Sequence, residues 1–130
     1  MFRPKNNIFR NWNKELYIAK KLDPIYDDYN NQIPQYDKPK YLGKFNYQHL
    51  TARDLQSYKE QYGEVKNNLV QCLVDYDIKS LIDEFDLAYL YGCSPKDENI
   101  NGEKANYVIK SIRGQNTKTL ILFEEIIKED

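Results

Sequence analysis

The sequence has few of the residues that usually carry catalytic chemistry. It contains one histidine, two cysteines and five glycines among 130 residues. The glycines stand apart from one another, so they form no phosphate-binding loop, and no serine or cysteine lies in a nucleophile-elbow motif. Cys72 and Cys93 have no second cysteine pair, which predicts buried free thiols rather than a disulfide framework or a zinc site. These absences favour a protein that is not an enzyme and uses no metal or cofactor.

The remaining polar candidates do not alter this interpretation. His49 has no cysteine or second histidine at ligand spacing, so we expect it to be neither a metal ligand nor a catalytic relay. The acidic pairs at 27–28, 83–84 and 124–125 lie beside predicted turns or at a strand end. Solvated surface charge is the ordinary expectation there, and nothing selects one pair as the two carboxylates of a glycosidase.

The sequence also lacks an excess of charge of one sign and any long apolar run. Nineteen basic and twenty acidic residues give a net charge of -1, whereas a dedicated DNA-reading protein normally carries a basic excess. No apolar run approaches the roughly 20 residues that span a bilayer, and residues 1–7 lack the apolar segment of a secretory signal. We therefore expect a soluble protein made in the cytoplasm, without membrane association.

Tyrosine, by contrast, is abundant. The chain has twelve tyrosines against one tryptophan and one methionine. A tyrosine has an apolar body and a polar tip, so it suits thin barrels and subunit interfaces, where one end packs and the other finds a hydrogen bond.

The C-terminal part has the clearest strand patterns. Residues 84–91 place Phe85, Leu87, Tyr89 and Tyr91 on alternate positions, which predicts one half-buried strand. Two β-branched runs, 106–113 and 117–123, flank a short loop with one glycine and therefore predict a hairpin.

The N-terminal part is divided into short strand-like pieces by proline, asparagine and glycine. The predicted strands are residues 16–22, 25–29, 41–47, bent at Gly43, and 64–76. A helix is the alternative for 16–22. Residues 32–40 contain two prolines, which predicts an edge or connecting segment. Residues 77–82 are predicted to form a turn or a single helical turn. The total predicts an all-β, mainly antiparallel small barrel of about six or seven strands with short helical turns. We expect one barrel domain over residues 14–130.

Residues 51–63 interrupt the strand pattern. They are highly polar and too long for a simple turn, which predicts a long loop inserted in the barrel, since loops of this length are usually functional or mobile. A short helix is the alternative, with Thr51 and Asp54 as a capping pair and Leu55, Tyr58 and Tyr62 on one side.

Residues 1–13 form a separate N-terminal arm. Three aromatic residues, Phe2, Phe9 and Trp12, lie in this short polar segment. Aromatic anchors are typical of interface hot spots, which favours an arm that docks on a neighbouring subunit. The alternative is a frayed terminus.

The order of these C-terminal patterns resembles that of the head-closure, or stopper, proteins of long-tailed bacteriophages. The resemblance lies in the acidic-aromatic-Asp step 84–86 within 78–90, and in a Gly/Pro/Asn-rich loop. It continues in a Tyr-x-Ile-x-x-Ile strand within 105–112 and a last strand ending at 123–124. It covers the last 50 or so residues well and the strands from Leu16 onward more loosely.

The resemblance implies a structural virion protein of the phage neck. Such a protein forms a ring of its own subunits, with the portal or adaptor protein above and a tail protein below, and it retains packaged DNA. The family's long loop projects into the channel. The matching segment here is 51–63, which makes Arg53, Tyr58, Lys59 and Tyr62 the side chains expected to face the channel and to make transient, non-specific contact with DNA.

Two other functions remain open at this point. One is a tail-terminator or other ring protein of the neck or tail. The other is a monomeric SH3-like or OB-like binding module for peptides or single strands, which would need exposed aromatics in a basic groove. A ring protein should expose apolar patches on two opposite faces, whereas a module should expose one.

Overall fold

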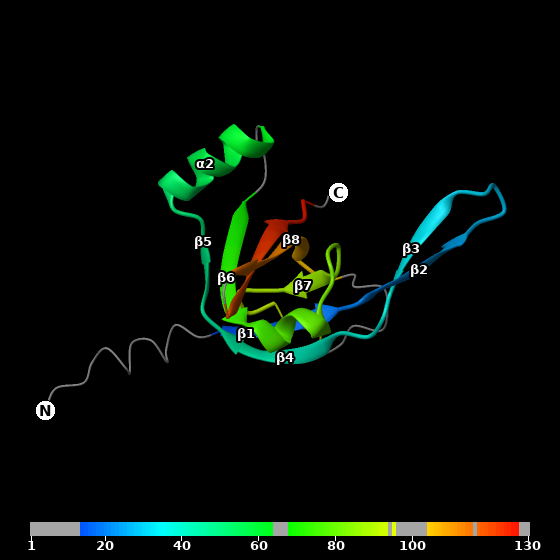
Figure 1. The fold of residues 1–130 in the computed structure, drawn as a ribbon. Helices are drawn as coiled ribbons and strands as arrows, with labels where there is room; N and C mark the ends of the chain where they lie inside the picture. The colour runs from blue at the N-terminus through cyan, green and yellow to red at the C-terminus, as the bar shows by residue number, and fades with distance from the viewer. Residues whose placement is uncertain (1–13, 64–67, 94, 96–103, 116, 128–130) are drawn as a thin grey trace, which may run out of the picture.

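The computed structural model describes residues 14–63, 68–93, 95, 104–115 and 117–127 (Figure 1). Its strands are β1 (Lys14–Ala19), β2 (Lys21–Tyr26), β3 (Gln32–Tyr36), β4 (Lys40–Phe45), β5 (Tyr47–His49), β6 (Leu69–Asp75), β7 (Leu87–Tyr89), β8 (Tyr107–Gln115) and β9 (Lys118–Glu125). The helix α2 (Ala52–Tyr62) follows β5, and the 3-10 helix η1 (Tyr76–Leu81) follows β6. The predicted fold class, a mainly antiparallel all-β barrel with short helical turns, is confirmed.

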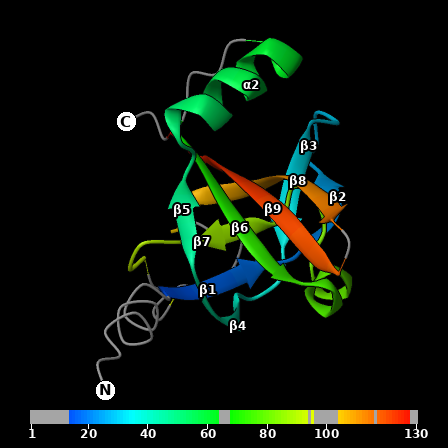
Figure 2. The ribbon, with the colours of Figure 1, turned by 60° about the vertical axis from the view of Figure 1, so that its left-hand side comes forward.

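Seven strands form one antiparallel sheet in the order β4-β1-β7-β8-β9-β6-β5. The sheet curls around the core, as Figure 2 shows. Its two outermost strands, β4 and β5, are consecutive parts of one bent segment, with only Asn46 between them. The same segment therefore pairs with β1 at one end of the strand order and with β6 at the other, so the curled sheet is joined to itself.

The bent segment was predicted at 41–47, and two features produce it. Gly43 has φ +142°, and the register of the β1–β4 pair shifts opposite it, between Leu16 and Tyr17. A Cβ added at Gly43 would lie 3.2 Å from the Phe45 ring, so glycine suits this position for both reasons. Beyond the bend, the buried Tyr47 hydroxyl donates to the Glu15 carbonyl and accepts from the Tyr91 N–H, both at 2.9 Å.

The core fills the inside of the curled sheet. It contains the inward side chains of β1, β6, β8 and β9, including Leu16, Val70, Ile109, Ile121 and Phe123. A second buried cluster, formed around Leu87, Tyr89, Ala19 and Ala105, lies on the other side of β7. The prediction of one half-buried strand over 84–91 is therefore wrong: the strand is only Leu87–Tyr89, and its three residues are buried on both sides of the sheet.

Asp86, just before β7, is fully buried, and its carboxylate accepts hydrogen bonds from one distant and one nearby backbone N–H. Its Oδ1 accepts from the Lys21 N–H at 2.8 Å, and its Oδ2 accepts from the Asp83 N–H at 2.9 Å. The Lys20 ammonium lies 3.0 Å from Asp86 Oδ2. A buried carboxylate is stable only when its charge and lone pairs are satisfied in this way.

The predicted C-terminal hairpin is confirmed. β8 and β9 pair antiparallel from Tyr107–Glu125 to Gln115–Lys118, with a register shift between Ile109 and Ser111. Alternate residues of β9 therefore face the core, which leaves Leu120 and Leu122 on the outer side of the barrel wall.

Strands β2 and β3 do not belong to the barrel sheet. They pair with each other in a separate two-stranded sheet, which we call the ribbon (residues 21–36). Figure 1 shows it projecting away from the curled sheet. Since β1 leads into β2 and β3 leads back into β4, the ribbon is the outer half of one long hairpin. The inner half, β1 and β4, lies in the barrel wall.

One expectation on this part of the chain needs correction, and another holds. Pro24 was expected to end a strand, but it lies inside β2, at the register shift between Leu22 and Ile25. Residues 32–40, expected as an edge or connection, contain β3, which is an edge strand of the ribbon, and the connection to β4. Proline is accommodated because the ribbon strands have free edges, where a missing N–H costs no ladder hydrogen bond.

Candidate functional site

The segment predicted as a long polar loop, residues 51–63, is a helix, so that prediction is wrong and the helix alternative holds. Thr51 is the N-cap, and its Oγ1 accepts from the Asp54 N–H at 3.1 Å. The helix ends at Gly63, which has φ +90° and donates its N–H to the Lys59 carbonyl at 2.8 Å. Asp54 in the first turn and Lys59 in the last also complement the helix dipole. These local signals outweigh the low apolar content of the segment.

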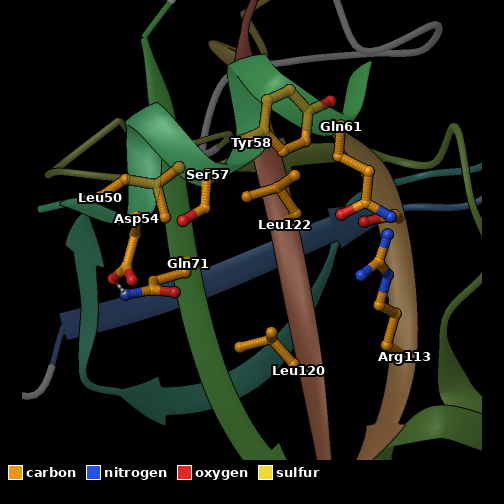
Figure 3. Close-up of a pocket in the computed structure, with 10 residues that line it drawn as sticks. Leu50, Asp54, Ser57, Tyr58, Gln61, Gln71, Arg113, Leu120 and Leu122 are labelled. Atoms are coloured by element: carbon orange, nitrogen blue, oxygen red, sulfur yellow. Dashed lines mark hydrogen bonds between the residues drawn. The ribbon is translucent and has the colours of Figure 1, made fainter. Parts of the chain in front are cut away.

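Helix α2 stands over the outer side of the barrel wall and leaves a hollow of about 190 Å³ between them (Figure 3). We call it the α2 hollow. The helix contributes Asp54, Ser57, Tyr58 and Gln61, one side of the helix at i, i+3, i+4, i+7 spacing. Leu50, just before the helix, closes the end near Asp54.

The barrel side of the α2 hollow is built from two cross-strand rows. Leu122 on β9 lies between Gln71 on β6 and Ser111 on β8. In the next row, Leu120 lies between Leu73 and Arg113. The floor is therefore apolar along β9 and polar on either side.

Polar contacts hold the helix over this floor. Gln71 Nε2 donates to Asp54 Oδ2 at 3.4 Å, at one end of the hollow. Lys110 Nζ donates to Glu124 Oε2 at 3.0 Å, and this hydrogen bond, with a smaller contribution from the Tyr58 hydroxyl, raises the pKa of Lys110. The two ends of the hollow carry opposite charges, because Asp54 lies at one end and Arg113 at the other (Figure 3).

The sequence-predicted site residues are only partly brought together. Tyr58 lines the α2 hollow and is half-buried. Arg53 and Lys59 lie on the same helix, but they are exposed and are not among the residues that line the hollow. Tyr62 is the last residue of the helix. The predicted docking residues of the arm, Phe2, Phe9 and Trp12, lie outside the described residues.

The ribbon is a second exposed surface that sequence reasoning missed. Ile25 pairs with Ile33 and Leu22 with Gln35, so these side chains share one side of the ribbon. The exposed fractions are 46% for Leu22, 53% for Ile25 and 39% for Ile33. The only sequence signal was the presence of aliphatic residues in two short strands, and that signal is equally typical of a strand in the core.

The tip of the ribbon is well ordered by its own hydrogen bonds. Asp27 Oδ1 accepts from the N–H groups of Tyr29 and Asn31, at 2.9 and 2.8 Å. Asn30, with φ +65°, occupies the left-handed conformation that asparagine tolerates. The backbone hydrogen bonds from Asn31 lower the pKa of the Asp27 carboxyl. The turn at the tip of the ribbon therefore has a defined conformation although the sides of the ribbon are exposed.

A third feature is a cluster of aromatic side chains at one end of the barrel. The rings of His49 and Tyr91 are stacked, with centroids 5.2 Å apart, and Tyr47 meets Tyr91 edge-on at 5.1 Å. The Lys14 ammonium lies over both tyrosine rings. Burial raises the pKa of Tyr91 to about 12. His49, to which the sequence assigned no role, is thus part of an aromatic stack.

The described residues hold no group of three or more histidine, cysteine and acidic side chains that could bind a metal ion. Within the same residues, no helix is long and apolar enough to cross a membrane. The chain matches no protein-family model, no curated protein and no solved structure.

Proposed function

We propose that the protein is a ring-forming structural protein of the phage neck, of the head-closure type. It joins the portal or adaptor protein to the tail and retains packaged DNA. The proposal rests on the resemblance of the C-terminal strand patterns, and the ribbon is the observation in the fold that best supports it. A small barrel whose own strands are joined into a curled sheet does not need a projecting pair of strands with exposed aliphatic side chains. Such a pair suits contact between subunits.

Helix α2 takes the place of the channel loop in this proposal. Arg53 and Lys59 are balanced by Asp54 and Glu60, so the helix has no net charge. A gate must block DNA without gripping it. A helix of mixed charge suits that task better than a lysine-rich collar, which would hold DNA through counterion release.

The proposal is tested with DNA-filled, tail-less heads of the phage that encodes the chain, or with its purified portal and adaptor. We expect the protein to bind the portal complex in a fixed stoichiometry, measured by light scattering, and to reduce DNA loss from the heads. A version lacking residues 1–13 tests the predicted docking role of the arm in the same assay.

Two results would replace the proposal. Binding to isolated tails but not to the portal complex would favour a tail-terminator. Failure to bind any virion component, combined with micromolar binding to a peptide or oligonucleotide, would favour the SH3-like or OB-like module.

A further inference from the structure

The aliphatic side of the ribbon needs a cover that the ribbon does not supply itself. Leu22, Ile25 and Ile33 share this side, and all three are exposed. An isolated two-stranded hairpin is only marginally stable in water, and packing against another element is the usual source of its stability. Contiguous exposed apolar side chains on such an element mark an interaction site.

Contact through the side of the ribbon is favoured over strand addition at its edge. Pro24 in β2 and Pro34 in β3 lack the N–H that an added strand would pair with. Proline in an edge strand blocks edge-to-edge pairing. The partner of the ribbon should therefore be an apolar hollow that receives side chains, and not another strand.

The α2 hollow has the size and lining of such a receiver. Its volume is about 190 Å³, and a cavity of roughly 150 Å³ lined by aliphatic residues holds a benzene-sized group. The hollow therefore accepts one isoleucine side chain with part of a neighbour. Leu120 and Leu122 form its floor, and Leu50 and Tyr58 form its walls.

The charges of the two surfaces are complementary in one orientation. Residues 22–36 contain three aspartates and no basic residue, whereas Lys20 and Lys21 lie at the base of the ribbon. The α2 hollow has Arg113 at one end and Asp54 at the other. Seating the Ile25–Ile33 pair in the hollow, with the acidic tip toward Arg113, places the basic end of the ribbon on the side of Asp54.

We infer that the ribbon of one copy of this chain seats in the α2 hollow of a second copy. The ribbon lies apart from the hollow of its own chain, and none of the residues that line that hollow belongs to it (Figure 1). Two different surfaces of the same chain then meet head to tail, which is the contact that builds rings when the rotation closes. The inference rests on the proposed ring-forming function and names the contact that forms the ring.

The test uses two full-length variants that each destroy one half of the contact. Ile33→Asp charges the exposed side of the ribbon, and Ser57→Trp fills the α2 hollow from an exposed position on the helix. We expect each variant alone to sediment as a monomer under conditions where the unaltered protein self-associates. An equimolar mixture should form a 1:1 dimer that grows no further, because one intact ribbon meets one intact hollow.

Disulfide trapping detects the contact even if it is too weak to give a stable dimer in sedimentation. In a Cys93→Ser background, Gln35→Cys on the ribbon and Ser57→Cys in the hollow should form a mixed disulfide at least about tenfold faster than Gln35→Cys with Lys44→Cys, an exposed control site. A tenfold ratio corresponds to about 1.4 kcal/mol. Equal rates for the two pairs, together with no dimer in the mixture, would overturn the inference.

Other outcomes identify other occupants. Dimerisation of the Ser57→Trp variant through its ribbon alone would show a two-fold contact between ribbons and overturn the head-to-tail arrangement. Failure of this contact with successful capture on the portal complex would leave the proposed function standing with a different subunit interface. If the ribbon and the hollow do meet but the protein is not captured on the portal complex, the interface would be supported and the phage role contradicted.

Discussion

The barrel and the ribbon are two halves of the same hairpin with opposite surroundings. In the barrel half, Leu16 and Ile18 of β1 are buried in a core that draws on most strands of the curled sheet. In the ribbon half, Leu22 and Ile25 of β2 lie in solvent. Both halves have strand geometry and aliphatic residues, so composition does not distinguish them. The difference is that the barrel supplies its own cover and the ribbon requires one from outside.

This difference separates the residues that keep the fold from those that make contacts. Substitutions inside the barrel should change the free energy of unfolding, whereas substitutions on the ribbon and in the α2 hollow should change association. Five predictions test this division, in order of decreasing expected effect.

The largest contrast is expected in amide hydrogen exchange. Amides of β6 and β9 should exchange only through global unfolding, whereas those of the ribbon should open locally, because few buried contacts hold it. The protection factors should differ by about 10³ or more, measured by exchange with mass spectrometry or NMR. Equal protection in the two regions would show that the ribbon is stabilised within the monomer.

Removing a core aromatic should have the next largest effect. Phe123→Ala deletes a fully buried ring of β9, and such a change costs about 3–5 kcal/mol of unfolding free energy. Urea denaturation measures it. Ile33→Ala on the ribbon is the matched control and should cost no more than about 0.5 kcal/mol, as exposed substitutions do. A large cost at Ile33 would contradict the division between barrel and ribbon.

Asp86 joins the two regions, so its substitution tests the boundary. Asp86→Asn removes the charge that faces Lys20 and one of the two acceptors for the backbone N–H groups of Lys21 and Asp83. We expect a loss of about 2–3 kcal/mol in unfolding free energy, with faster exchange at the base of the ribbon.

Two controls define that result. Asp28→Asn, at the exposed tip, should leave stability unchanged. Asp83→Asn removes only the exposed partner of Lys20 and should cost less than about 1 kcal/mol. A loss at Asp83 as large as that at Asp86 would mean that the ion pair, and not the buried hydrogen bonds, holds the ribbon.

The two thiols should show the smallest contrast. Burial raises the pKa of Cys72 to about 12, so its reactive thiolate is scarce at neutral pH, while Cys93 is half-buried. We expect Cys93 to react with a thiol reagent at least about tenfold faster, and a Cys93→Ser variant to lose the fast phase.

The contribution of Cys72 to folding stability should fall with rising pH. Its pKa is higher in the folded protein than the ordinary 9.0, so the neutral buried thiol contributes its full stability below pH 9 and loses it as the pH rises through about 12. A Cys72→Val variant should therefore lose less stability than the unaltered protein between pH 9 and 12. An equal loss in the two proteins would contradict the burial of this thiol.

The elements fixed by local patterns were predictable from the sequence. The β8–β9 hairpin was visible as two β-branched runs around Gly114, and the bent strand as an alternating run around Gly43. Helix α2 was visible as the alternative for 51–63, in the capping pair Thr51 and Asp54 and in the spacing of Leu55, Tyr58 and Tyr62. The high polarity of the segment is more typical of a loop, which is why the pattern did not single out the helix.

The features that depend on distant partners were not predictable. The burial of Asp86 was not predictable, because its partners at Lys20 and Lys21 are more than sixty residues away and are backbone and side-chain groups without a sequence pattern. The departure of the ribbon from the barrel depends on which strands pair, and the two halves of that hairpin look alike in sequence. The floor of the α2 hollow, Leu120 and Leu122, could not be predicted either. Alternation shows that these residues share one side of β9, but it does not tell that a helix covers that side.

The continuous hairpin also determines how the molecule bears mechanical load. A pull on the tip of the ribbon passes into β1 and β4 together, and these two strands move as one. The load then falls on the ladders between β1 and β7 and, through the bend at Asn46, between β5 and β6. The β1–β7 ladder is pulled along its strands, so its hydrogen bonds must break together instead of one after another. The barrel is therefore built to resist being drawn out by its ribbon.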